Sequence, residues 1–142
     1  MIPSHPCSFL LIEDNAADAD LIQRVLKKVD PSNSIYLARD GEEALQMLNN
    51  WGGNLPAPMI VLLDLKLPKV DGLEILKSIK SNKQLKTLPI VVLTSSNQLK
   101  DIHEAYLLGA NSYILKAIDF DEFSKAIELI YRYWCRLNVC PL

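Results

Sequence analysis

The chain has 142 residues, of which 49% are hydrophobic and 23% are charged, and its formal net charge at pH 7 is −2. This composition is ordinary for a globular protein and excludes a largely disordered chain. The small negative charge gives no electrostatic reason to bind nucleic acid or an anionic membrane surface, so we expect neither as a partner.

The three cysteines, Cys7, Cys135 and Cys140, are an odd number and do not have the spacing of metal ligands. The first residues also lack the long apolar core of a signal peptide. We therefore expect a cytoplasmic protein with free thiols.

Strand and helix signals alternate along the chain after an irregular arm at residues 1–7. In chain order, apolar runs and apolar stripes predict a strand at 8–12, a helix at 16–29, a strand at 35–38, a helix at 41–51, a strand at 59–63, a helix at 72–81, a strand at 89–94, a helix at 98–108, a strand at 112–115 and a last helix that opens at 119. Such alternation implies a mostly parallel sheet with helices on both faces, because right-handed crossovers return the chain to the same edge. With no internal repeat and no long linker, we predict one α/β domain, residues 1–142, built on a doubly wound five-stranded sheet.

Polar residues stand where these strands end. Glu13 and Asp14 follow the first strand, Asp64 follows the third, Thr94 ends the fourth, and Lys116 follows the fifth. The carboxyl ends of parallel strands meet at one edge, where open α/β sheets bind their ligands. We therefore expect three acids, a hydroxyl and an ammonium to meet in one shallow crevice.

This set of side chains suits a metal ion and an anionic ligand. Clustered acids raise one another's pKa unless a cation lies among them, and Mg²⁺ prefers oxygen ligands and keeps part of its water shell. We expect Mg²⁺ to bind Glu13, Asp14 and Asp64, with water and the Lys66 carbonyl completing its shell. Thr94 and Lys116 would then face a phosphoryl group.

The same acids also have a simpler interpretation. Pro68 and the pair Asp71-Gly72 mark a chain reversal soon after Asp64, so Asp64 could serve only as a turn cap. Asp14 could likewise only cap the helix that follows it, a role that is compatible with metal binding.

Taken together, the spacing of these residues resembles the receiver domain of two-component response regulators. Pro68 lies four residues after Asp64, Gly72 eight, Thr94 thirty and Lys116 fifty-two, and the resemblance covers about residues 8–137. It implies the strand order 2-1-3-4-5 and a signalling protein, rather than an enzyme, that accepts a phosphoryl group from a histidine kinase.

The resemblance also implies a role for each site residue. Asp64 would be phosphorylated, Glu13 and Asp14 would bind Mg²⁺, and Thr94, with Ser95 beside it, and Lys116 would sense the phosphate. Tyr113 matches an aromatic residue that turns inward on activation. The chain departs from the family at Ala117, where most members have a proline, usually cis, after the lysine, so the aim of Lys116 is left open.

Finer features resemble one branch of this family, the small stand-alone receivers that are partnered with cyanobacterial phytochromes. These features are the connector with Pro56 and Pro58, the segment 65–72, the strand that ends in Thr94 and an aromatic tail near Tyr133. They imply a phytochrome as the partner kinase. We also expect no output domain, because the chain ends about where the last helix does.

Two alternatives belong to other functional classes. A metal-dependent phosphatase or other hydrolase would need a general acid or base, and the histidines available are His5, in the arm, and His103, on the fourth helix. An adaptor that no longer takes phosphate would not need the complete set of acids, hydroxyl and lysine.

The tail, about residues 132–142, continues the apolar character of the last helix. Phe120, Phe123, Ile127 and Ile130 suffice to cover the sheet, which leaves an apolar surface over for an interaction. The resemblance suggests a homodimer through the fourth helix, fifth strand and fifth helix together with the tail. The alternative is that the tail folds back onto its own domain.

Overall fold

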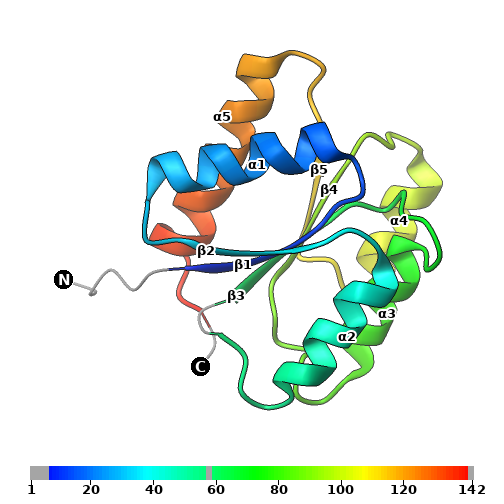
Figure 1. The fold of residues 1–142 in the computed structure, drawn as a ribbon. Helices are drawn as coiled ribbons and strands as arrows, with labels where there is room; N and C mark the ends of the chain where they lie inside the picture. The colour runs from blue at the N-terminus through cyan, green and yellow to red at the C-terminus, as the bar shows by residue number, and fades with distance from the viewer. Residues whose placement is uncertain (1–6, 57–58, 141–142) are drawn as a thin grey trace.

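The computed structural model describes residues 7–56 and 59–140 and contains a five-stranded parallel sheet covered by helices on both faces (Figure 1). The strand order is β2-β1-β3-β4-β5, which confirms the predicted doubly wound architecture. The elements are β1 (Ser8–Ile12), α1 (Ala16–Val29), β2 (Ser34–Ala38), α2 (Gly41–Trp51), β3 (Met59–Leu63), α3 (Gly72–Ser81), β4 (Ile90–Thr94), α4 (Leu99–Leu107), β5 (Ser112–Leu115), α5 (Phe120–Tyr131) and the π-helix η1 (Arg132–Leu137). Within the two described segments, no helix is both long and apolar enough to cross a bilayer.

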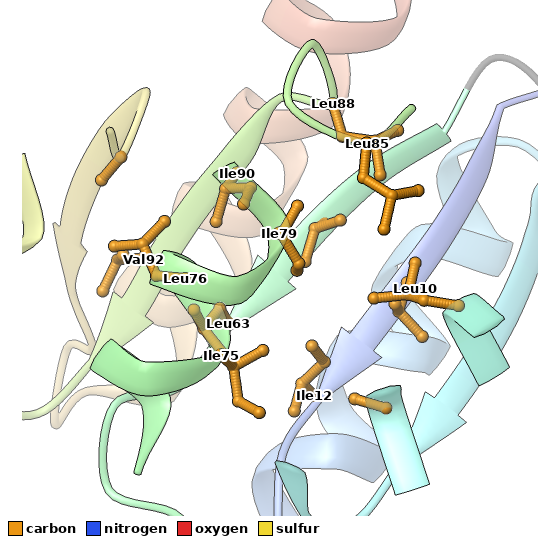
Figure 2. Packing of buried hydrophobic residues seen from close by; sticks show 14 of the residues in the cluster. Leu10, Ile12, Leu63, Ile75, Leu76, Ile79, Leu85, Leu88, Ile90 and Val92 are labelled. Carbon is orange, nitrogen blue, oxygen red and sulfur yellow. The ribbon is translucent and has the colours of Figure 1, made fainter. Parts of the chain in front are cut away.

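The three central strands are buried on both faces, because their side chains alternate between two apolar layers. One layer lies between the sheet and helices α2, α3 and α4, and Figure 2 shows it around Ile75 and Leu76. The other layer lies between the sheet and helices α1 and α5, around Ile22 and Ile127. Each fully buried aliphatic side chain stabilises the fold by roughly 1.5–3 kcal/mol, so these two layers dominate its stability.

Side-chain caps fix where four of the helices begin. Asn15, Asp40, Asp71 and Asp119 each accept a hydrogen bond from a backbone N–H in the first turn of the helix that follows. Each cap fixes the residue at which its helix begins after the preceding strand has ended. They also explain why the predicted helix starts at residues 16, 41 and 72 agree with the observed ones.

The strand ladders continue by one residue at the carboxyl edge of the sheet. The backbone N–H of Glu13 donates to Ala38 O at 3.0 Å, that of Asp64 to Ile12 O at 3.0 Å, and that of Lys116 to Thr94 O at 2.8 Å. The first residue after each of these strands is therefore held by the sheet itself, and its side chain projects from a fixed position.

One prediction about the C-terminal part needs correction. Phe120 does not cover the sheet, because 66% of it is exposed, whereas Phe123, Ile127 and Ile130 are buried as expected. The aromatic tail begins with the π-helix η1, and Trp134 of this helix packs against the core layer beneath α1 and α5, as in the alternative in which the tail folds back. The predicted arm lies outside the described residues, apart from Cys7.

The prediction of free thiols was wrong for two of the three cysteines. Cys7 and Cys135 form a disulfide with Cα atoms 6.0 Å apart, although 128 residues separate them in the sequence. Figure 1 shows why, because η1 follows α5 back to the start of β1. Spacing along the chain could not reveal a pair that only the folded topology brings together. Cys140 remains a free thiol.

The disulfide should contribute measurably to stability because it closes most of the chain into one loop. We expect Cys135→Ser to lower the free energy of unfolding by about 2–4 kcal/mol, as measured by denaturant titration without reductant. Cys140→Ser is the matched control and should leave the unfolding midpoint close to that of the parent. Three reactive thiols in the denatured, unreduced protein would contradict the assignment.

Candidate functional site

Three carboxylates gather at the carboxyl edge of the sheet. Glu13 follows β1, Asp14 follows it directly, and Asp64 follows β3, and one oxygen from each lies within 4.8 Å of the others. Glu13 and Asp64 are buried, whereas Asp14 is exposed. The structure thus brings the three predicted acids together.

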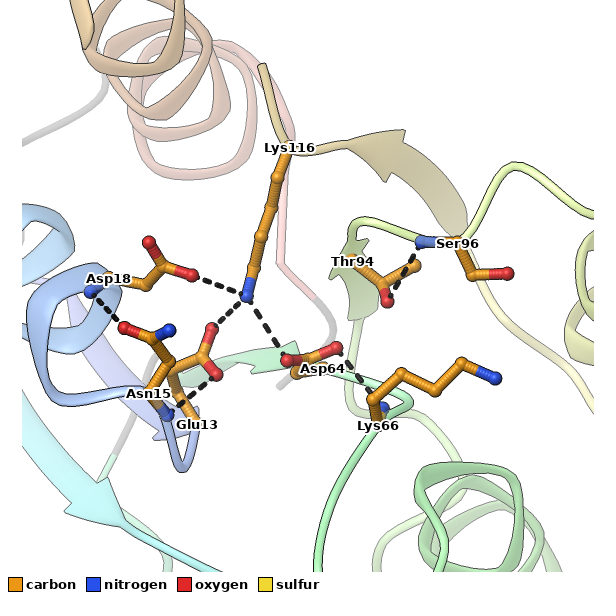
Figure 3. A network of polar contacts seen from close by, with 8 residues as sticks. All are labelled: Glu13, Asn15, Asp18, Asp64, Lys66, Thr94, Ser96 and Lys116. Carbon is orange, nitrogen blue, oxygen red and sulfur yellow. Dashed lines mark hydrogen bonds and ion pairs between the residues drawn. The ribbon is translucent and has the colours of Figure 1, made fainter. Parts of the chain in front are cut away.

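Lys116 reaches into this cluster from the end of β5 (Figure 3). Its Nζ lies 2.5 Å from Glu13 Oε1, 2.8 Å from Asp18 Oδ2 and 3.1 Å from Asp64 Oδ2. Only 9% of the lysine side chain is exposed, so these contacts form largely out of water. Ala117, in place of the usual proline, therefore still leaves Lys116 aimed at Asp64.

Burial and charge shift the pKa values of these groups in different directions. Burial raises the pKa of Glu13 to about 7, although the hydrogen bond with Lys116 acts against this shift. Burial also acts to raise the pKa of Asp64, but the hydrogen bond with Glu13 and the charge of Lys116 outweigh it, so this pKa is lowered. Of these two buried carboxyl groups, Asp64 therefore ionises more readily than Glu13.

Burial alone would lower the pKa of Lys116, but its carboxylate partners reverse the effect. Hydrogen bonds with Asp18 and Glu13, together with the charges of Glu13 and Asp64, raise the pKa of the ammonium above its ordinary value. The lysine is thus a permanent positive charge at the site near neutral pH.

The loop after β3 holds the second oxygen of Asp64. The backbone N–H of Lys66 donates to Asp64 Oδ1 at 3.2 Å. The start of α3 packs directly onto this loop, where a Cβ on Gly72 would lie 2.5 Å from Leu65 Cα and 2.6 Å from Asp64 O. Only glycine fits this approach, which is the physical reason for a glycine eight residues after Asp64.

A second network connects the ends of β4 and β5 to α4. Tyr113 OH donates to Ser96 O at 2.9 Å, and Ser96 Oγ donates to Asp101 Oδ2 at 2.5 Å. Lys66 Nζ lies 3.3 Å from the same Asp101 oxygen, so the loop after Asp64 joins this network. Thr94 is fully buried at the end of β4. Polar contacts thus run from the loop after Asp64, and from Tyr113, to Asp101 on α4.

Sequence reasoning missed three residues of these networks. Asp18, Ser96 and Asp101 make contacts that we did not predict. Ser95, which we did predict as a site residue, is exposed just after β4, and its role stays a prediction. Asp18 resembles an ordinary first-turn acid of a helix. No local signal in the sequence distinguishes Asp18 from such an acid, because its contact with Lys116 joins segments 98 residues apart.

The donor set suits a divalent cation. Three carboxylate oxygens within 4.8 Å of one another are hard ligands, and the exposure of Asp14 leaves the site open to solvent. Burial raises the pKa of Glu13, and a cation bound beside it would favour the charged form of this carboxyl group. Glu13, Asp14 and Asp64 are the residues that could hold such an ion.

Comparison with known proteins agrees with this geometry. A family model described as the response regulator receiver domain matches residues 9–128. The chain is 42% identical over 137 residues to the probable methanogenesis regulatory protein FilR2 of Methanothrix harundinacea, covering 96% of this chain and 88% of that protein. It is 38% identical over 138 residues to the response regulator Rcp1 of a Synechocystis species, covering 96% of this chain and 94% of that protein.

Solved structures give the same result. The crystal structure of the phosphorylated cyanobacterial phytochrome response regulator RcpA matches with a TM-score of 0.91 and 36% identity, covering 97% of this chain and 100% of that chain. The Mn²⁺-bound form of Rcp1 matches with a TM-score of 0.88 and 38% identity, covering 96% of this chain and 100% of that chain. The chain therefore belongs to the response regulator receiver domain family.

Proposed function

We propose that Asp64 accepts a phosphoryl group from a sensor histidine kinase of the phytochrome type, in the cytoplasm. The observation that carries this proposal is the position of Asp64, a buried carboxylate 3.1 Å from Lys116 within an acidic cluster. The phytochrome partner rests on similarity to RcpA, a phytochrome response regulator. We also propose that residues 1–142 form one receiver domain, of which the family match covers residues 9–128.

The chemistry follows from the positions of three side chains. An Asp64 oxygen attacks the phosphorus of the kinase phosphohistidine, and the bond between phosphorus and the imidazole nitrogen breaks as the new bond forms. Lys116, 3.1 Å from Asp64, pairs with the phosphoryl oxygens of the product. Thr94 donates its hydroxyl from the end of β4. These groups stabilise negative charge that increases beside Asp64.

We propose that Mg²⁺ is the divalent cation of this site, held by Glu13, Asp14 and Asp64 with the Lys66 carbonyl and water. When bound, it would neutralise part of the charge on the phosphoryl oxygens. The Mn²⁺-bound form of Rcp1 supports this proposal, because it is a divalent-cation complex of a relative that is 38% identical.

The output of the switch should be a change at the α4 surface. Thr94 would move toward the phosphoryl group, and this movement would alter the contact of Tyr113 with the backbone of Ser96, which now measures 2.9 Å. Because Ser96 also binds Asp101 on α4, the change would pass to that helix.

The hydrolase and adaptor alternatives gain no support from the site. His103 is exposed on α4, and His5 lies outside the described residues. The acids, the hydroxyl and the lysine are all present at one edge of the sheet, which an adaptor without phosphate would not require.

The surface beside the site favours a homodimer as the assembled form. Exposed apolar side chains extend over α4, β5 and the start of α5, and they are Leu99, Tyr106, Leu107, Leu115, Ile118 and Phe120. Exposed apolar side chains on these neighbouring elements favour an interaction site there. Tyr133, Leu137 and Val139, which are also exposed, would extend it beyond α5. We propose that phosphorylation modulates this dimer.

The phosphoacceptor can be identified by mass spectrometry after incubation with Mg²⁺ and a small phosphodonor such as acetyl phosphate. We expect one added phosphoryl group, located on Asp64, because this carboxylate is ionised and lies beside Lys116. Asp64→Asn should abolish the adduct, and omission of Mg²⁺ should greatly reduce it. Asp20→Asn, which removes an exposed acid on α1, is the matched control and should keep the adduct. Labelling that persists in Asp64→Asn would exclude the assignment.

The proposed dimer can be tested by sedimentation at tens of micromolar protein. Leu107→Glu places a charge within the apolar surface on α4 and should convert dimers to monomers. Asn50→Glu adds the same charge at an exposed position on α2 and should leave the sedimentation coefficient unchanged. A parent protein that is monomeric with and without phosphodonor would rule out this assembly.

A further inference from the structure

Asp18 contacts the lysine of the site although it is not one of the clustered acids. Its Oδ2 lies 2.8 Å from Lys116 Nζ, and 30% of its side chain is exposed. Among the residues that the structure describes, the group of acids with oxygens within 4.8 Å of one another is Glu13, Asp14 and Asp64, without Asp18. Figure 3 shows Asp18 and Asp64 on opposite sides of the ammonium. Asp18 is thus a partner of Lys116 that lies outside the acid cluster.

A divalent cation and the Lys116 ammonium would compete for two of the same carboxylates. Lys116 lies 2.5 Å from Glu13 and 3.1 Å from Asp64, and both acids belong to the cluster that suits a metal ion. Two positive centres that share these oxygens repel each other, so a bound cation weakens both lysine contacts. The contact with Asp18 is free of this conflict.

We propose that Asp18 is a positioning residue, which retains the Lys116 ammonium beside Asp64 when a divalent cation binds Glu13 and Asp64. The proposal rests on the proposed function only in requiring that a divalent cation binds the acid cluster. Without the cation, the ammonium has three carboxylate partners and loses little when one is removed. With the cation, Asp18 is the one of the three that the metal does not also bind.

The chain offers a clean variant and a matched control. The cap of α1 uses the backbone N–H of Asp18, which donates to Asn15 Oδ1 at 3.0 Å, so Asp18→Asn removes the carboxylate charge and leaves this hydrogen bond in place. Asp20→Asn removes a charge from the same helix, and Asp20 pairs with Arg24 at 3.0 Å rather than with Lys116. Both variants therefore lose one negative charge from α1, but only Asp18→Asn changes a residue that contacts Lys116.

The position of Lys116 can be measured by its rate of acylation with an amine-reactive ester, followed by peptide mass spectrometry. In the parent and in Asp20→Asn, we expect Lys116 to stay protected with and without saturating Mg²⁺. In Asp18→Asn, it should stay protected without Mg²⁺ and become several-fold more reactive when Mg²⁺ is added. Equal protection of Lys116 in Asp18→Asn and the parent under saturating Mg²⁺ would overturn the proposal.

The affinity for Mg²⁺ gives a second test that a purely structural role of Asp18 would not meet. Asp18→Asn should weaken Mg²⁺ binding roughly three- to tenfold, since contacting charged residues couple with about this strength. In a Lys116→Met background the same change should weaken it by less than about twofold, because the contact no longer exists. An equal loss of Mg²⁺ affinity in both backgrounds would show a simple charge effect and overturn the positioning role.

A parent protein that binds no divalent cation would overturn this proposal and the proposed metal site together. Binding of Mg²⁺ without coupling between Asp18 and Lys116 would overturn the positioning role alone.

Discussion

A single buried ammonium holds the polar edge of this fold together. Lys116 contacts Glu13 at 2.5 Å, Asp18 at 2.8 Å and Asp64 at 3.1 Å. Burying carboxylates without a partner is costly, and burial raises the pKa of Glu13 even though Lys116 contacts it. The three carboxylates that gather at this edge also suit a divalent cation. The stability of this edge and the function that we propose for it therefore involve the same contacts.

The topology of the sheet decides how these contacts form. Because β4 lies between β3 and β5, Lys116 must reach across the end of β4 to meet Asp64. Thr94 ends β4 there, and its short side chain is fully buried. Backbone hydrogen bonds one residue beyond the strands fix the positions of Glu13, Asp64 and Lys116. The site is thus a consequence of the strand order and of the residues that follow the strands.

Most of the fold was predictable because buried strands and amphipathic helices leave strong local patterns. The apolar run from Met59 to Leu63 ends at an acid, and this transition marked Asp64 as the candidate phosphoacceptor from the sequence alone. The contacts that the sequence concealed are those made between distant segments. The disulfide joins Cys7 to Cys135, which is 128 residues away in the sequence. Asp18 has the sequence features of an acid in the first turn of a helix, and only the folded structure shows its contact with Lys116. The local periodicity of apolar residues cannot predict contacts between segments that are far apart in the sequence.

The most direct test of the role of Lys116 in stabilising the acid cluster is the free energy of unfolding of Lys116→Met, measured with and without Mg²⁺. Without Mg²⁺, the variant should lose about 3–5 kcal/mol of unfolding free energy, because removing one partner leaves buried carboxylates unpaired. Saturating Mg²⁺ should restore much of this loss, since the cation binds the same acids in place of the ammonium. A Lys116→Met protein as stable as the parent without Mg²⁺ would contradict the account.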